Sequence, residues 1–120
     1  GTANAIDATG TATAAQVASG YITSTSAAAT TITLPTGTLL GAAVSATQGT
    51  VLDLFIDNTA GANTVTIAVA TNGVLSTGAV DAAAAAGTFG DLTVASGATG
   101  LARFTIMFSS ATAYVFTRTA

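Results

Sequence analysis

Residues 50–69, TVLDLFIDNTAGANTVTIAV, carry the clearest strand pattern in the chain. In the first half, leucine and isoleucine alternate with valine, phenylalanine and aspartate, which is the period of a strand with one buried face. In the second half, threonine alternates with valine and isoleucine. The segment NTAGAN at 58–63 supplies the asparagine and glycine of a turn. The stretch predicts a β-hairpin with an inward face made of Leu52, Leu54, Ile56, Val65, Ile67 and Val69.

The segments around this hairpin predict further strands and one helix. A second hairpin is expected within residues 100–118, with its turn at 109–111. Residues 36–49, TGTLLGAAVSATQG, predict the one helix, capped by Thr36 or Thr38 and ended by Gly49. Shorter strands and one alanine-rich loop complete the prediction: strands at 20–24, 30–34, 74–80 and 92–94, and the loop at 81–90.

The first 18 residues carry few large apolar side chains, so they add little to a core. We expect an extended N-terminal arm at 1–18 and a β-sandwich domain at 19–120. The arm is either flexible or ordered against a neighbouring subunit, and the sequence leaves both possibilities open. The expected fold class is all-β: an antiparallel, jelly-roll-like sandwich with one short helix.

The composition excludes several classes of function. Charged residues make up 6% of the 120 residues, against about 25% in ordinary soluble proteins. The mean hydropathy is +0.69, yet polar residues interrupt every apolar run before the roughly 18 residues of a membrane span. Residues 1–15 also lack the pattern of a secretory signal. With two arginines, no lysine and a net charge of −3, we expect neither nucleic-acid nor membrane binding.

The side chains that carry most enzyme chemistry are missing. The chain has no His, Cys, Lys or Glu, so imidazole bases, thiol nucleophiles and soft metal sites are excluded. Asp53 and Asp57 lie roughly 13 Å apart along one strand, at about 3.3 Å per residue, which is too far for a glycosidase pair. We therefore expect no enzyme and no cofactor. A structural ion pair across strands, Asp53 with Arg103, is the preferred role for these charges.

Both faces of the predicted sheet are partly apolar. In residues 101–108, for example, one face can form core while the other still carries Leu101 and Met107. A sheet that is apolar on both faces lies inside a sandwich or against another subunit. Threonine and serine could also solvate the second face, but the low charge favours a subunit. The residues expected at this subunit interface are Val51, Phe55, Tyr114 and Phe116.

Three segments resemble a known family: ITLPTGTLLGAA, QGTVLDLFIDNTAGANTVTIAVATNG and LTVASGATGLARFTIMFSSATAYVFTR. Together they resemble the small β-sandwich domain of capsid decoration proteins, also called cement or head-fibre proteins, of tailed bacteriophages. The resemblance covers residues 30–118. The alanine-rich loop at 81–90 and the Leu-Ala pair before Arg103 depart from the family's pattern.

The resemblance implies a structural virion protein: a homotrimer on the outer capsid surface, where it contacts and clamps the major capsid protein. Two alternatives stay open. One is an extracellular filament subunit that donates its N-terminal arm as a strand to its neighbour. The other is a tail-fibre or ligand-binding β module, for a sugar or for ice, although the Thr-x-Thr pairs show no fixed repeat in the sequence.

Overall fold

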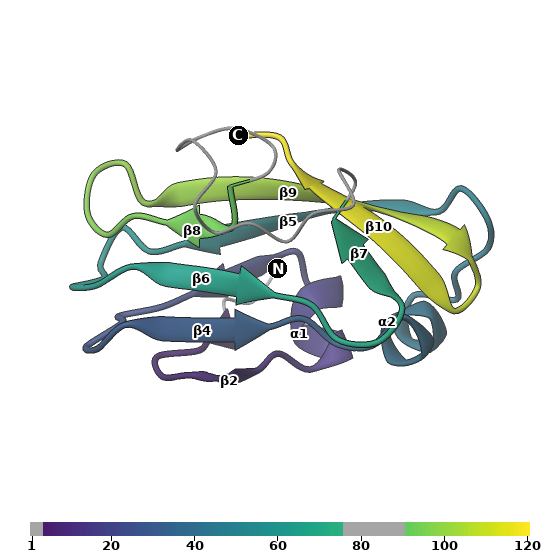
Figure 1. Cartoon of the computed structure of the whole chain (residues 1–120), viewed down its shortest axis with the longest axis horizontal. Helices are drawn as coiled ribbons and strands as arrows, with labels where there is room; N and C mark the ends of the chain where they lie inside the picture. The colour runs from purple at the N-terminus through teal and green to yellow at the C-terminus, as the bar shows by residue number, and fades with distance from the viewer. Residues whose placement is uncertain (1–3, 76–90) are drawn as a thin grey trace.

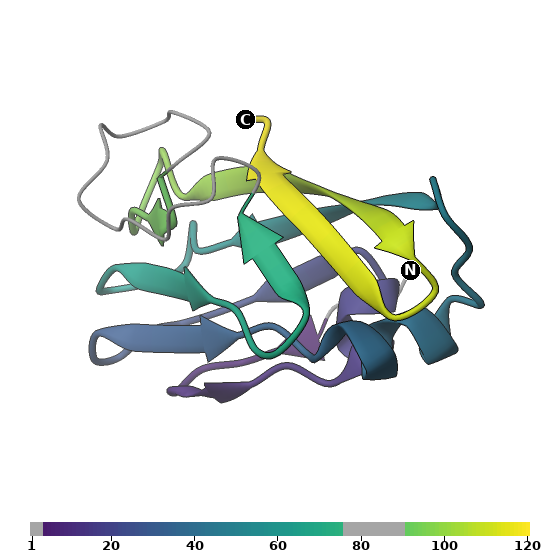
Figure 2. The same ribbon diagram turned by 45° about the vertical axis from the view of Figure 1, so that its right-hand side comes forward.

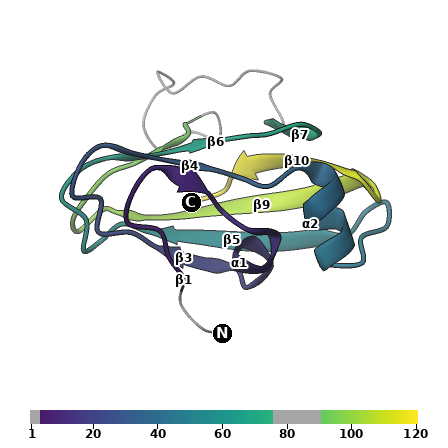
Figure 3. The same cartoon turned by 90° about the horizontal axis from the view of Figure 1, so that it is seen from below.

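The computed structural model of the chain describes residues 4–75 and 91–120. These residues form two facing β-sheets and two short helices (Figures 1 and 3). The helices are α1 (Ala14–Ala18) and α2 (Gly37–Ala43). In spatial order the six-stranded sheet holds β1 (Asn4–Ala5), β3 (Tyr21–Thr23), β5 (Val51–Asp57), β9 (Leu101–Ser110), β10 (Ala113–Arg118) and β7 (Gly73–Leu75). The four-stranded sheet holds β2 (Gly10–Thr11), β4 (Thr30–Thr33), β6 (Val65–Ala68) and β8 (Thr93–Val94).

From β1 to β6 the chain alternates between the two sheets. This part of the chain therefore winds through three stacked turns, or coils, each with one strand in each sheet. Strands β1, β3 and β5 pair in parallel in one sheet, and β2, β4 and β6 pair in parallel in the other. After this coiled half, β9 pairs antiparallel with both β5 and β10, and β8 pairs antiparallel with β6. The fold is thus mixed α/β with parallel and antiparallel pairing. The prediction of an all-β antiparallel, jelly-roll-like sandwich is wrong.

The central hairpin prediction is also wrong in its pairing, although both of its strands form. Strand β5 pairs with β3 and β9, whereas β6 lies in the other sheet beside β4 and β8. The turn at 58–63 is a crossover between sheets. Period-two alternation fixes which side chains point inward but not which strand pairs with which. The inward face is as predicted: Leu54, Ile56, Val65 and Ile67 are buried, and Leu52 and Val69 pack against them in part.

A buried asparagine holds this crossover. The side-chain amide of Asn58, 0% exposed, donates to the carbonyl oxygens of Asn63 at 2.9 Å and Val94 at 3.1 Å. Its side-chain oxygen accepts from the hydroxyl of Ser26 at 2.9 Å. These bonds join the crossover to the preceding coil and to β8. The turn is therefore anchored by one buried asparagine, although Thr59, Ala60 and Ala62 within it are exposed.

Residues 4–18 are part of the fold and not an extended arm. They contribute β1 and β2 to the two sheets, and then α1, whose Val17 is 0% exposed. Helix α1 begins with a capping box: Thr13 Oγ1 accepts from the backbone N–H of Gln16, whose side chain accepts from the backbone N–H of Thr13. The low apolar content hid these elements because edge strands of two residues and a five-residue helix bury few large side chains.

The helix predicted at 36–49 forms as α2 with Thr36 as its N-cap, but it ends at Ala43, so the predicted end at Gly49 is wrong. The hairpin predicted within 100–118 is confirmed as β9 and β10. Figure 2 shows α2 beside the turn that joins these two strands. The close approach requires glycine, since a Cβ at Gly41 would overlap the carbonyl oxygen of Ala111. The loop predicted at 81–90 lies outside the described residues.

The core lies between the sheets and is built around aromatic side chains from the C-terminal hairpin. The rings of Phe104 and Phe116 have centroids 5.8 Å apart, and those of Phe108 and Tyr114 lie 5.7 Å apart. Tyr114 satisfies its hydroxyl by donating to the carbonyl oxygen of Pro35 at 2.7 Å, and its burial raises its pKa to about 12. This contact fixes the hairpin to the segment that enters α2.

Replacing Asn58 by alanine tests the crossover. The change removes the buried donor to the carbonyl oxygen of Val94 and one of two donors to that of Asn63, which keeps its bond from the Ser26 hydroxyl. We therefore expect the free energy of unfolding to fall by about 1–3 kcal/mol. Urea denaturation measures it. Gln48, an exposed amide, is the matched control, and Gln48→Ala should change stability by less than about 0.5 kcal/mol. Equal effects of the two changes would contradict a structural role for Asn58.

Candidate subunit interface

The outer face of the six-stranded sheet carries side chains in cross-strand rows. Val51 of β5, Met107 of β9 and Val115 of β10 are register partners, and we call these three residues the apolar row. Val51 is 57% exposed and Met107 40%, so the row presents apolar surface to solvent. Exposed large apolar side chains grouped on one sheet face are typical of a protein contact.

A second row on the same face combines rings and a charge. Tyr21, Phe55 and Arg103 are register neighbours on β3, β5 and β9, and we call them the mixed row. Phe55 is 37% exposed. Asp53, Thr105 and Thr117 lie between the two rows, and Thr105 donates its hydroxyl hydrogen to Asp53 Oδ1 at 2.7 Å. The apolar row is therefore the uncharged part of this face, and Arg103 belongs to the other row.

The four residues predicted at the subunit interface do not lie together. Val51 and Phe55 point outward from β5 and are exposed. Tyr114 and Phe116 are each 1% exposed and point into the core, so they leave no surface for a partner. The β9–β10 register pairs Tyr114 with Phe108 and Phe116 with Ile106, on the inner face. The large apolar residue that points outward from β10 is Val115. The alternation along β10 could have identified it once the inner face of the hairpin was chosen.

The predicted partners Asp53 and Arg103 each take a different contact. Asp53 accepts from Thr105, and Arg103 Nε donates to the hydroxyl of Thr119 at 2.9 Å. The ion pair among the described residues joins Arg118 to Asp91 at 3.4 Å, with side chains 9% and 3% exposed. The sequence missed this pair because Asp91 lies in a segment with no strand pattern until Leu92.

Tyr21 and Asp57 form a polar contact at the edge of the mixed row. The Tyr21 hydroxyl donates to Asp57 Oδ2, while Asp57 Oδ1 accepts from the backbone N–H of Thr59 at 3.0 Å and from its hydroxyl at 2.6 Å. The hydrogen bonds from Thr59 and then from Tyr21 lower the pKa of Asp57. The bond to Asp57, with some desolvation, raises the pKa of Tyr21. The contact is strongest with Asp57 ionised and Tyr21 protonated.

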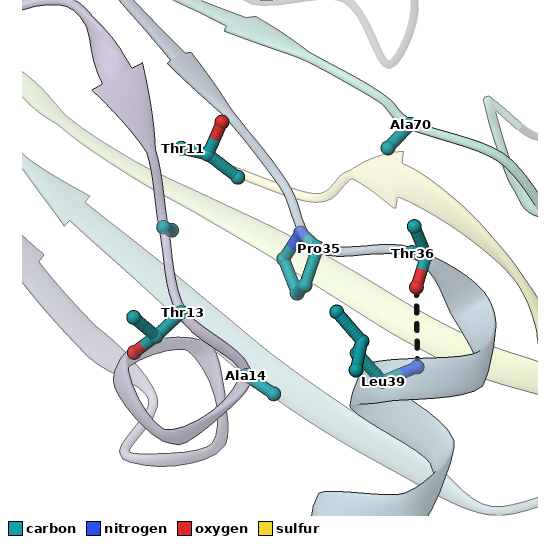
Figure 4. A pocket seen from close by; sticks show the side chains of 8 residues that line it. Thr11, Thr13, Ala14, Pro35, Thr36, Leu39 and Ala70 are labelled. Carbon is teal, nitrogen blue, oxygen red and sulfur yellow. Dashed lines mark hydrogen bonds between the residues drawn. The ribbon is translucent and has the colours of Figure 1, made fainter.

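A second apolar feature is a groove at one end of the four-stranded sheet (Figure 4). It has a volume of about 430 Å³ and lies where β2 leads into α1, β4 leads into α2, and β6 ends. Leu39, 60% exposed, is its largest exposed apolar side chain. The hydroxyl of Thr36 accepts from the backbone N–H of Leu39 at 3.2 Å. No lining residue is charged: they are Thr11, Ala12, Thr13, Ala14, Pro35, Thr36, Leu39 and Ala70.

The apolar row and the groove are the two apolar surfaces described above, and neither includes a charged residue. No group of three or more His, Cys, Asp or Glu within residues 4–75 and 91–120 is placed to hold a metal ion. In the same part of the chain, none of the helices has the length and apolarity to cross a membrane.

The Tyr21–Asp57 contact predicts a pH dependence of stability. Because the pKa of folded Asp57 lies below its unfolded value, its contribution is present above about pH 4 and is lost as the pH falls. Because the pKa of folded Tyr21 is raised, its contribution is complete below about pH 10 and is lost above. Tyr21→Phe should therefore flatten the alkaline limb of a plot of unfolding free energy against pH. It should flatten the acid limb only in part, because the hydrogen bonds from Thr59 still lower the pKa of Asp57.

The alkaline limb should not vanish in this variant, because Tyr114 keeps its raised pKa. Thr105→Val, which removes the donor to Asp53, is the control, since it leaves the Tyr21–Asp57 contact intact. Urea midpoints between pH 3 and 11 measure both variants. A Tyr21→Phe curve parallel to the wild-type curve would show that the contact does not couple to folding.

Comparisons with known proteins provide no relative from which to transfer a function. The chain matches no protein-family model, no curated protein and no solved structure.

Proposed function

We propose that this chain is a structural virion protein that decorates and stabilises the outer face of a phage capsid as a homotrimer bound to the major capsid protein. The observation that carries the proposal is the outer face of the six-stranded sheet. Four large apolar side chains are exposed there: Val51, Phe55, Leu101 and Met107. A contact that covers them would remove apolar surface from water, which is the main driving force of association.

The composition supports an assembled protein of this kind. Only seven of 120 residues are charged, two arginines and five aspartates, so few charges keep separate copies apart. The chain lacks His, Cys, Lys and Glu, which fits a structural protein without catalytic groups or a cofactor. Two arginines are also too few for tight contact with phosphates of nucleic acid or of a membrane.

The capsid partner rests on the sequence resemblance alone. The segments that carry the resemblance include α2 with its preceding Thr-Leu-Pro, strands β5 and β6, and the β9–β10 hairpin. The antiparallel sandwich and the extended arm are no part of the proposal, since the sheets are mixed and residues 4–18 lie within the fold. What remains is a compact β-rich subunit with large apolar side chains exposed on the outer face of its six-stranded sheet.

The filament alternative has less support in its strand-donation form. The residues that would be donated include β1 and β2, which already pair with β3 and β4 of their own chain. Donation would break these bonds before forming new ones. An open polymer made through side-chain contacts stays possible, and the size of the assembly separates it from a closed trimer.

Light scattering on the purified protein tests the self-assembly. We expect roughly 34 kDa, three times the 11.4 kDa of one chain. Phe55→Asp should yield monomers, because it places a third carboxylate on the apolar outer face, beside Asp53 and Asp57. Ala29→Asp, at an exposed position between β3 and β4, is the matched control and should keep the mass of the wild type. A monomeric wild-type protein would contradict the proposed trimer.

The place of the protein on a virion needs its own measurement. In phage particles that contain the chain, gold-labelled antibody against it should decorate the outer head surface in electron micrographs. Particles that lack the protein provide the control for background labelling. Label confined to the tail would contradict capsid decoration and favour the tail-fibre alternative.

A further inference from the structure

We infer that copies of this chain join head to tail, with the apolar row of one copy docked in the groove of the next. The apolar row is Val51, Met107 and Val115, and the groove is the hollow beside Leu39 at the end of the four-stranded sheet. This inference rests on the proposed self-assembly and adds which two surfaces meet.

The distribution of exposed apolar side chains leads to this pairing. Five large apolar residues of the described chain are exposed, and they fall into two groups. Val51, Phe55, Leu101 and Met107 lie on the outer face of the six-stranded sheet, whereas Leu39 lies at the groove. One subunit thus presents an exposed apolar row and an apolar hollow, and each could cover the other in a contact between two copies.

The groove accepts an uncharged side chain. None of its eight lining residues is charged, and its lining surface is almost wholly apolar. Two of its hydroxyls already serve as helix caps, since Thr13 accepts from Gln16 and Thr36 accepts from Leu39. A charged occupant would lose its water there without gaining a partner. The apolar row is the uncharged part of the sheet face, so it matches this requirement and the mixed row does not.

Met107 suits the centre of such a contact. It lies between Val51 and Val115 in register and is 40% exposed. Its unbranched side chain adapts to irregular hollows, and methionine is enriched at the centres of interfaces where charged residues are depleted. Arg103 and the carboxylates of Asp53 and Asp57 would remain at the rim, where water can reach them.

A face-to-face contact between two identical sheet faces fits the charges less well. Each face carries Asp53 and Asp57 against the single cation Arg103, so two stacked faces would bring together like net charges. The apolar row lies on the six-stranded sheet, whereas the groove lies at the end of the four-stranded sheet, so the two are different surfaces of the subunit. Contact between them is heterologous, which closes into a ring or grows into a filament according to the rotation it imposes.

Disulfide trapping tests the contact directly because the chain has no cysteine of its own. Met107→Cys and Leu39→Cys are made in separate chains, mixed, allowed to exchange subunits and then oxidised. We expect covalent dimers that contain one chain of each kind, identified by mass, and few from either variant alone. Ala29→Cys mixed with Met107→Cys is the matched control and should stay uncoupled.

The outcomes separate this inference from the proposed function. Strong coupling of Met107→Cys with itself would show a face-to-face contact and overturn the inference while self-assembly stands. A wild-type mass retained by Leu39→Asp would also overturn it, since Leu39 is 60% exposed and an acidic residue in the first turn of α2 favours the helix. A small molecule found in the groove by native mass spectrometry, with no coupling, would assign the groove to a ligand. A monomeric wild-type protein would contradict the proposed self-assembly, on which this inference rests.

Discussion

The side-chain amide of Asn58 is the constraint on which the coiled half of the fold depends. It lies at the point where the chain leaves β5 in one sheet for β6 in the other, and it is wholly buried. Its hydrogen bonds to Ser26, Asn63 and Val94 hold this crossover against the preceding coil and against β8. An apolar residue would remove these bonds and take from the carbonyl oxygen of Val94 its buried amide donor.

The strand pattern allowed prediction of local structure and of side-chain direction, because both depend on nearby residues. Leu54, Ile56, Val65 and Ile67 point inward as predicted, and Thr36 is the N-cap of α2. Which strands pair with one another could not be predicted from this pattern. A strand that alternates every two residues forms equally well beside a parallel or an antiparallel neighbour, and Asn58 in a turn looks the same whether the turn closes a hairpin or crosses between sheets.

At the candidate interface, too, the sequence predicted the features that depend on neighbouring residues and missed those that depend on residues far apart in the chain. Val51 and Phe55 were predicted correctly to point away from the Leu54 side of β5, since parity within one strand is local. The direction of Tyr114 depends on its pairing with Phe108 across the hairpin, and the groove depends on segments far apart in the sequence. Neither could be derived from one strand alone. The two-residue strands β1 and β2 lacked even a local pattern.

The two halves of the fold produce the two apolar features separately. Because β2, β4 and β6 are parallel, their carboxyl ends meet at one edge of the sheet, with Thr11, Thr33 and Ala68 in register. The residues that follow, Ala12 to Ala14, Pro35 and Ala70, therefore come together and line the groove. An antiparallel hairpin at 50–69 would have placed these ends apart. The apolar row instead arises where β5, β9 and β10 pair antiparallel, so parallel coiling supplies the hollow and antiparallel closure supplies the row that would fill it.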